Sequence, residues 1–300
     1  MNDVVIVGAG PAGIAAGIYL KRAGFEPLVF EKEDIGGLLL NANFVENYPG
    51  FPEGIGGEDL AGLFKKQLSR LGIEVKRKEV IKISPQKGLF KLITDDDEII
   101  SQAVIMATGT TPKSIDIQGQ TPLIGRKLFY EIKNIPPPKK GDIVMIIGGG
   151  DAAFDYALNI AKDVERVDII YRSEKDKCLA LLRERVKDRS NIHVHPTTKP
   201  LTVREEKEHV IVKCESQGKE IVFPSDYVLI ACGRRPNLKV LSEDMVRDLS
   251  IGENGGTNIP GLFIAGDVKR GRYRQTGIAV GDGILCAMSV VDYLMGDERK

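Results

Sequence analysis

The chain has 300 residues, enough for two domains that each bury a core of their own. Lysine plus arginine and aspartate plus glutamate are both 42, so the formal net charge is zero, which argues against a nucleic-acid surface or a polyanionic partner. No apolar run approaches the length needed to span a bilayer, and the first predicted strand begins too early for a signal peptide, so we expect no membrane partner.

The chain opens with the pattern of a dinucleotide-binding βαβ unit. Residues 4–7 form an apolar run that predicts a buried parallel strand, and an alanine- and leucine-rich helix pattern follows. Between them, Gly8 permits a tight turn, Gly10 lets a pyrophosphate approach the backbone, and Gly13 lets the helix pack on the strand. The next strand ends at Glu31, where a carboxylate can accept hydrogen bonds from ribose hydroxyls. This combination predicts a dinucleotide site.

The next part of the chain completes this first unit. Residues 36–52 are too rich in glycine, proline and asparagine for a helix or strand, and such a long loop in a compact domain is usually functional. An amphipathic helix is predicted over residues 57–71. Short strands then return the chain to the main sheet, and we expect them at residues 73–75, 80–83, 89–93 and 103–107.

The opening pattern then repeats. A second buried strand is predicted over residues 142–147, a second phosphate loop at Gly148, Gly149 and Gly150, and a further strand at residues 167–170 after a helix. An internal duplication of a whole βαβ unit indicates that one chain carries two dinucleotide sites.

Arg172 follows the second unit at the place where an acid would bind a ribose 2′-hydroxyl. An arginine there can bind a 2′-phosphate instead, which favours NADPH over NADH. Glu174 and Asp176 dilute the positive charge, so an ordinary solvated arginine remains the alternative.

Beyond this point we expect a helix at residues 179–189, strands at 192–194, 209–213, 220–223 and 227–231, a strand ending in Gly-Asp at 266–267, and a helix from 277 to about 294. Four basic residues follow the Gly-Asp pair. They are Lys269, Arg270, Arg272 and Arg274. Such a cluster would steer an acidic electron carrier toward the first site. Neutralisation of cofactor phosphates by one or two of them is the alternative.

The four cysteines are far apart and include no Cys-x-x-Cys pair, so we expect neither a disulfide framework nor a metal site and place the protein in the reducing cytoplasm. Cys214, Cys232 and Cys286 fall on apolar elements and are predicted to be core residues. Neighbouring lysines and an arginine could lower the pKa of Cys178, although the sequence offers it no partner thiol.

The motifs together resemble the low-molecular-weight thioredoxin reductase family of flavoproteins over nearly the whole chain. They are the two glycine loops, Glu31, Val-Glu-Asn-Tyr-Pro-Gly at 45–50, Ala-Thr-Gly at 107–109, Ala-Gly-Asp at 265–267 and Tyr-Arg-Gln-Thr at 273–276. The resemblance implies an α/β fold of two Rossmann-like, three-layer ββα domains. It implies a discontinuous FAD-binding domain, residues 1–112 and 240–300, with an NAD(P)-binding domain, residues 113–239, inserted between them. We also expect a homodimer.

The resemblance implies FAD at the first site and NADPH, or NADH, at the second. The predicted FAD-binding residues are Gly8, Gly10, Pro11, Ala12, Gly13, Glu31, Lys32, Gly36, Gly37, Asn47, Val80, Ala107, Thr108, Gly109, Gly266, Asp267, Arg274, Gln275 and Thr276. The predicted residues around the nicotinamide nucleotide are Gly148, Gly149, Gly150, Asp151, Ala152 and Arg172.

The sequence departs from that family where its members carry Cys-Ala-Thr-Cys. Glu131 and Asn134 occupy the two cysteine positions, so the usual relay, in which a thiolate attacks a disulfide and a second thiol resolves it, is excluded. The replacement stretch is similar to that of ferredoxin/flavodoxin–NADP reductases of the thioredoxin reductase type.

We therefore expect an enzyme that passes a hydride from NAD(P)H to flavin and electrons onward to a carrier such as ferredoxin or flavodoxin. No side chain is assigned a catalytic role, because the flavin carries the chemistry. One alternative is an oxidase or diaphorase that uses O₂, quinones or other small acceptors. Another is a flavin-binding module without catalysis, although two intact glycine loops weigh against it.

Overall fold

The computed structural model describes residues 2–296, and the chain divides into two compact units. Unit 1 consists of Met1–Leu40, Val45–Thr111 and Arg235–Lys300, and unit 2 consists of Asn41–Phe44 and Pro112–Arg234. Unit 1 therefore takes both ends of the chain. The division after 234 lies earlier than the expected boundary at 239/240, and the short segment 41–44 belongs to unit 2.

Unit 1 is built on a seven-stranded sheet whose centre is β1 (Asn2–Val7). The strand order is β5-β2-β1-β8-β7-β6, and β19 (Leu262–Ile264) pairs in parallel with β8. The other strands are β2 (Leu28–Glu31), β5 (Val75–Arg77), β6 (Val80–Gln86), β7 (Leu89–Thr94) and β8 (Glu98–Met106). β8 joins sequence-distant segments, because it pairs with β1 on one side and β19 on the other.

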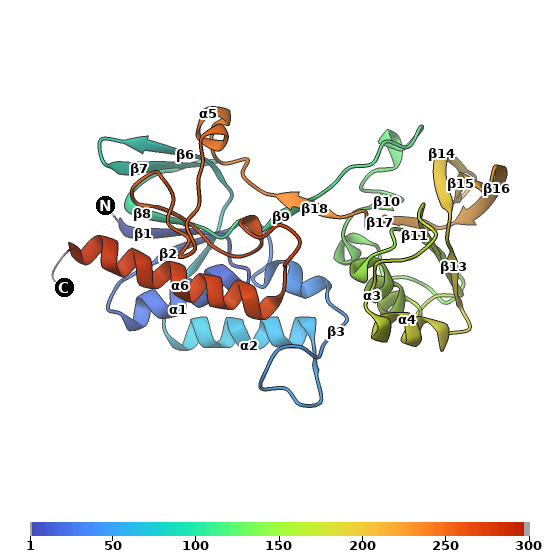
Figure 1. The fold of residues 1–300 in the computed structure, drawn as a ribbon, viewed down its shortest axis with the longest axis horizontal. Helices are drawn as coiled ribbons and strands as arrows, with labels where there is room; N and C mark the ends of the chain where they lie inside the picture. Colours follow the sequence, from blue (N-terminus) through green and yellow to red (C-terminus); the bar gives the residue numbers. More distant parts are fainter. Residues whose placement is uncertain (1, 297–300) are drawn as a thin grey trace. The chain divides into compact units, whose positions relative to one another are not determined.

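The two faces of this sheet are covered by different layers. Val4 and Ile6 pack in one cluster with α1 (Pro11–Arg22), α6 (Thr276–Met295) and part of α2 (Gly57–Arg70). Val5 and Val7 point the other way and pack with side chains of the β6–β7 hairpin. Figure 1 shows α1, α2 and α6 together on one side of the strands of this unit. The alternation of a strand's side chains between faces produces this layering.

The C-terminal helix α6 corrects one expectation. By length and composition it could cross a membrane, with a mean hydropathy of 1.6 over an 18-residue window, so the statement that no apolar run approaches that length was wrong. Core helices of soluble proteins pass the same test. In this structure α6 packs along α1, and it holds a buried charge at Asp282.

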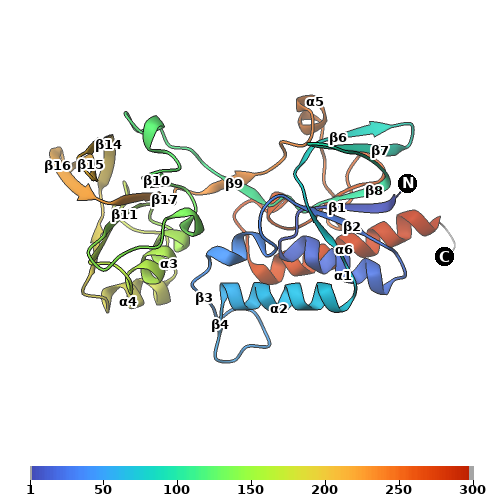
Figure 2. The same cartoon turned by 180° about the vertical axis from the view of Figure 1, so that it is seen from behind.

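Unit 2 repeats the architecture on a parallel sheet of order β10-β17-β11-β12-β13. Its strands are β10 (Leu128–Phe129), β11 (Ile143–Ile147), β12 (Arg166–Ile170), β13 (Ile192–His195) and β17 (Tyr227–Ile230). Val144 and Ile146 pack with α3 (Asp151–Ile160) and α4 (Ala180–Lys187), whereas Met145 and Ile147 pack with an antiparallel sheet. That sheet consists of β14 (Thr198–Glu206), β15 (His209–Ser216) and β16 (Lys219–Ser225). Figure 2 shows these layers on opposite sides of the parallel strands.

Several elements differ from the sequence prediction. Strand β14 was not predicted, because Pro200 and its polar neighbours hide the strand pattern. The short helix α5 (Glu243–Arg247), capped by the Ser242 side chain, was also missed. The remaining elements are β3 (Phe44–Val45), β4 (Ile55–Gly56), β9 (Thr110–Pro112), β18 (Arg234–Pro236), and the 3₁₀ turns η1 (Gly37–Asn41), η2 (Thr121–Leu123), η3 (Ile132–Asn134) and η4 (Gly266–Val268).

Candidate functional site

The first glycine loop is interlocked with its surroundings except at Gly10. A Cβ on Gly8, whose φ is +107°, would lie 2.3 Å from the Ala107 carbonyl oxygen, and one on Gly13 would lie 1.9 Å from the Gly8 carbonyl oxygen. Gly8 and Gly13 are therefore required by the fold itself. A Cβ on Gly10 would meet no atom within 4 Å. The space beside Gly10, at the start of α1, is open to a ligand, as a pyrophosphate requires.

Glu31 ends β2 beside this loop, as predicted, and its carboxylate also shapes the loop. Its Oε2 accepts a hydrogen bond from the Ala9 amide at 2.7 Å, and its Oε1 accepts one from the Glu33 amide at 2.9 Å. A carboxylate oxygen has two acceptor sites, so these bonds leave capacity for a ribose hydroxyl. The sequence pattern predicted the residue and missed this second role.

Two later segments come against the same loop. The Gly36 amide donates to the Ala9 carbonyl at 2.9 Å, and a Cβ on Gly37 would lie 3.2 Å from the Gly10 Cα. A Cβ on Gly266 would lie 2.7 Å from the Ala12 Cβ, which brings η4 against the start of α1. The structure thus brings predicted residues from two later segments of the sequence, 36–37 and 266, to the first glycine loop.

The other predicted FAD residues are distributed as follows. The Asn47 side chain donates to the Gln275 side chain at 2.8 Å, immediately before Thr276 begins α6. The Thr108 hydroxyl donates to the Asn237 carbonyl at 2.7 Å. Val80 is a core residue, 4% exposed. Pro11 lies in the first turn of α1, and Lys32 lies near Glu33 and Glu79. Gly109 has a φ of +63°, and Asp267 lies in η4. Arg274 donates a hydrogen bond from Nε to the Arg270 carbonyl.

The basic cluster after η4 is not the free surface that the sequence predicted. Lys269 is 8% exposed at its side chain, donates to the Glu253 carbonyl at 2.8 Å and lies 3.9 Å from the Asp282 carboxylate. Arg270 binds the same buried carboxylate, with Nε 2.9 Å from Oδ2. The docking hypothesis is therefore wrong for Lys269, whose side chain is buried beside an internal acid on α6. Arg270 pairs with the same acid while its side chain stays 39% exposed, and Arg272 is exposed.

The second glycine loop repeats the geometry of the first. A Cβ on Gly148 would lie 2.4 Å from the Ala231 carbonyl oxygen, and one on Gly149 would lie 2.9 Å from the Tyr171 ring. Gly150, the counterpart of Gly10, has no atom within 4 Å of its Cβ position. The open position again lies at the start of a helix, here α3.

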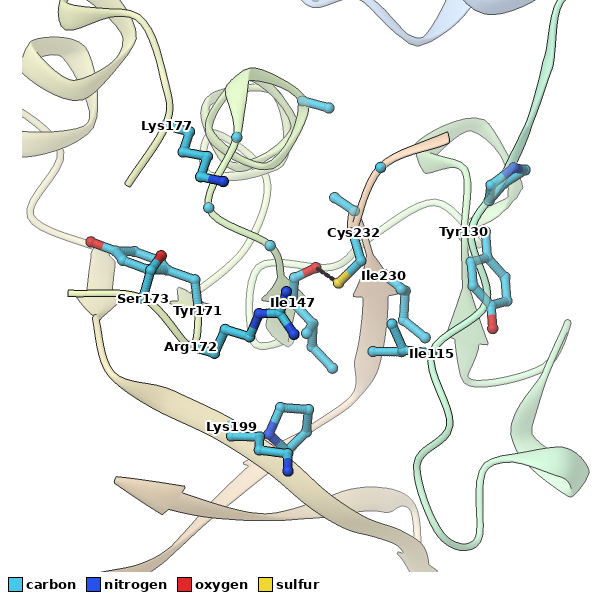
Figure 3. Close-up of a pocket in the computed structure, with 18 of the residues that line it drawn as sticks. Ile115, Tyr130, Ile147, Tyr171, Arg172, Ser173, Lys177, Lys199, Ile230 and Cys232 are labelled. Atoms are coloured by element: carbon cyan, nitrogen blue, oxygen red, sulfur yellow. Dashed lines mark hydrogen bonds between the residues drawn. The ribbon is translucent and has the colours of Figure 1, made fainter. Parts of the chain in front are cut away.

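A pocket of about 610 Å³ surrounds this second loop, a size typical of small-molecule sites. It brings together all the residues predicted for the nicotinamide nucleotide, which are Gly148, Gly149, Gly150, Asp151, Ala152 and Arg172. Figure 3 shows Arg172 between Lys177 and Lys199, while Tyr130 lies on the side of the pocket away from Tyr171 and Ser173.

Three cations line this pocket without an acidic partner among residues 2–296. They are Arg172, Lys177 and Lys199. Unpaired cations at the mouth of a dinucleotide loop favour a ligand with more phosphate than NAD(H) carries. The sequence pointed to Arg172, but it gave no signal for Lys199, which comes from the unpredicted strand β14.

The position of the missing dithiol is filled by a buried ion pair. Glu131, whose side chain is 13% exposed, accepts from Arg234 Nη1 at 2.6 Å through Oε1 and from Asn41 Nδ2 at 2.6 Å through Oε2. Asn134 is exposed at the end of η3, and its amide donates to the Glu131 carbonyl at 3.1 Å. The sequence identified Glu131 only as a lost cysteine and missed its partners.

The four cysteines are all free thiols. Burial raises the pKa of Cys214 and of Cys286 to about 12. Burial and a hydrogen bond to Asp176 raise the pKa of Cys178 to about 12, so the expectation of a lowered pKa there was wrong. The nearby Arg183 cation pairs with Asp176 instead of serving the thiol.

Cys232 was predicted to lie in the core. It is exposed and lines the nucleotide pocket, with its Sγ bonded to the Ile147 carbonyl at 3.3 Å. Residues 2–296 contain no group of three or more His, Cys, Asp or Glu residues that could hold a metal ion.

These features define a class: two βαβ-based units, each with a glycine loop open to a dinucleotide. The sequence matches the family described as pyridine nucleotide-disulphide oxidoreductase over residues 2–283, and the chain belongs to that family. It is a flavin-dependent NAD(P)H oxidoreductase of this family's thioredoxin reductase-like branch, with FAD and NADPH as cofactors.

Several relatives are named thioredoxin reductases. The chain is 33% identical to that of Mycoplasma genitalium, over 97% of this chain and 94% of the relative, and 31% identical to that of Treponema pallidum, over 97% of each. It matches NADPH-dependent thioredoxin reductase 3 of Arabidopsis thaliana at 30% identity over 98% of this chain, and spans 58% of that relative.

Among solved structures, the thioredoxin reductase of Lactococcus lactis in its FR conformation superposes with a TM-score of 0.90 at 29% identity, covering 98% of this chain and 99% of that chain. The thioredoxin reductase of T. acidophilum gives a TM-score of 0.89 at 31% identity, covering 98% and 99%. The expected α/β fold of two Rossmann-like domains is confirmed.

Proposed function

We propose that this protein passes electrons from NADPH through FAD directly to an external electron carrier such as ferredoxin or flavodoxin, without a redox-active disulfide of its own. When bound, FAD supplies the hydride-accepting and electron-storing chemistry. In this proposal unit 1 holds FAD through the first glycine loop, and unit 2 holds the nucleotide through the second. Their domain boundaries are proposed at 112/113 and 239/240.

One observation carries the proposal. Glu131 occupies the position at which the thioredoxin reductases that this chain resembles carry the first cysteine. Its carboxylate is hydrogen-bonded to Arg234 and Asn41. A carboxylate has no sulfur to attack a disulfide, and the exposed Asn134 supplies no resolving thiol. Burial raises the pKa of Cys178, Cys214 and Cys286 far above neutral pH. Cys232 lines the nucleotide pocket as a single free thiol, so the cysteines do not replace the pair.

A disulfide acceptor, thioredoxin above all, is the second candidate. The names of the relatives favour it, since proteins 31–33% identical to this chain are thioredoxin reductases. Electrons would then have to reach the acceptor disulfide without an enzyme thiol.

Steady-state assays with NADPH separate these candidates. We expect turnover with ferredoxin or flavodoxin as acceptor and no turnover with thioredoxin plus a chromogenic disulfide. Thioredoxin turnover that is abolished by Cys178→Ser, with carrier reduction absent, would overturn the proposal. Turnover with quinones or O₂ alone would favour a small-acceptor oxidase.

We also propose a homodimer formed through the outer face of α6. Ile284, Leu285 and Met288 lie on one side of this helix and are 39–44% exposed, which leaves an apolar stripe beside the buried face. A second copy of the chain would remove that stripe from water.

A further inference from the structure

Arg234 is a pocket residue whose role no sequence motif suggests. It lines the nucleotide pocket together with Gly150, Asp151 and Ala152, the residues at the start of α3. Its partner Glu131 directly follows Tyr130, which lies on the side of the pocket away from Ser173 and Lys177 (Figure 3). Arg234 is thus bonded to the residue next to Tyr130, whereas Arg172 directly follows Tyr171.

The Glu131 carboxylate is fixed at both oxygens. Oε1 is bonded to Arg234 and Oε2 to Asn41, each at 2.6 Å, and Asn41 is itself 3% exposed. A carboxylate held in this way cannot rotate without breaking one bond, so it fixes the guanidinium that it binds.

A gain in the stability of the fold does not explain an ion pair that is buried to this degree. The side chains of Arg234 and Glu131 are 20% and 13% exposed, and at such sites the cost of desolvation commonly cancels the attraction between the charges. Fixing the direction of a cation beside a ligand is a use that such a pair serves well.

The charge of Glu131 also reaches a second pocket residue. Burial raises the pKa of Tyr156 on α3, and the Glu131 charge adds to that effect while Arg234 opposes it. Tyr156 lines the same pocket, so the Glu131–Arg234 pair lies against the pocket wall.

We propose that Arg234 binds the pyrophosphate of the nicotinamide nucleotide and that Glu131 is the positioning residue that holds Arg234 there. This inference rests on the proposed binding of the nucleotide in this pocket. A pyrophosphate at the start of α3 would meet the N–H groups of the helix from one side and the guanidinium from another. The position of Glu131, at which the family carries a cysteine of its dithiol, would thus serve nucleotide binding in this chain.

The test uses the FAD-loaded protein and the unreactive probes NADP⁺ and NAD⁺, with binding followed by the change in flavin absorbance. Arg234→Met should raise the Kd of both nucleotides about 10- to 100-fold, because both carry the pyrophosphate. Arg172→Met should weaken NADP⁺ alone. Arg235→Met, which changes an exposed neighbour outside the pocket, should leave both Kd values unchanged.

Glu131→Gln tests the positioning role because it keeps the shape and removes the charge. It should raise both Kd values about 3- to 10-fold, and Glu131→Asp should recover part of the loss. The double variant Glu131→Gln/Arg234→Met should bind no more weakly than Arg234→Met alone, because Glu131 acts through Arg234.

Additive losses in the double variant, or an unchanged Kd in Glu131→Gln, would overturn the inference while leaving the proposed function intact. A loss in Arg234→Met confined to NADP⁺ would also overturn it, since it would assign Arg234 to the 2′-phosphate. If the wild-type protein binds neither nucleotide, the proposed function and this inference both fail.

Discussion

The open Cβ positions in the two glycine loops predict that the same substitution removes FAD binding at one loop and NADPH binding at the other. Gly10 and Gly150 have extended backbones at the caps of α1 and α3, and neither Cβ position has an atom within 4 Å. A Cβ atom fits at either place without moving protein atoms. Gly10→Val should therefore fold and lose FAD, whereas Gly150→Val should fold, keep FAD and lose reduction by NADPH.

The magnitude follows from the bonds at risk. The added Cβ and Cγ atoms would occupy the space through which a pyrophosphate reaches the N–H groups of the loop. Each charged hydrogen bond contributes about 1.5–3 kcal/mol, so losing two costs about 3–6 kcal/mol. That loss corresponds to roughly a 10²- to 10⁴-fold weaker affinity.

The assay measures flavin per chain by absorbance after purification and the Kd for added FAD, with far-UV circular dichroism and thermal unfolding as folding checks. Each variant is the control for the other, because the same substitution is made in the same geometry. Full flavin content and wild-type affinity in Gly10→Val would refute the assignment of the first loop. Loss of flavin in Gly150→Val would show that the two loops are not assigned as proposed.

Three further predictions follow from other parts of the molecule. Anaerobic reduction with NADPH should leave the thiol content of the denatured protein at four per chain, and a rise on reduction would reveal a disulfide. The pKa of Asp168 is lowered, because the hydrogen bonds and charges of His195 and Arg166 outweigh the effect of burial. Asp168 should therefore stabilise the fold above its unfolded pKa of about 3.9 and lose that contribution as the pH falls through its folded pKa. Asp168→Asn should thus lower the unfolding free energy at pH 7 by about 1–3 kcal/mol and flatten its decline in acid; an unchanged acid profile in urea melts would contradict this. Leu285→Glu should convert a dimer to a monomer in light scattering, whereas unchanged mass would exclude the α6 face.

Features set by neighbours in sequence were predictable, and features set by distant partners were not. The two glycine loops, their flanking strands and the helices after them follow from local patterns that the structure reproduces. The basic cluster failed because Asp282, on the next helix, takes up Lys269 and Arg270.

The thiol and strand errors arose from partners that are close in sequence but whose contacts the pattern of residues does not show. Asp176 binds both Cys178 and Arg183, so a cation close in sequence does not activate the thiol. Strand β14 is stabilised by pairing with β15, and its own residues show little alternation. The sequence shows Glu131 only as a replacement for a cysteine, because its partner Arg234 lies 103 residues further along the chain.

The sheet order of unit 1 also bears on how the chain reaches its native state during synthesis. β19 adds to the edge of β8, and α6 packs so closely on α1 that a Cβ on Gly283 would lie 2.1 Å from the Ala12 carbonyl oxygen. Both partners follow unit 2 along the chain, whereas almost all of unit 2 is one uninterrupted stretch. The inserted unit can therefore fold on the ribosome while the unit containing the N-terminus waits for its last helix, reversing the usual N-terminal-first order. Until that helix is released, α1 keeps an apolar face uncovered, so loss of α6 would expose this face permanently and favour aggregation.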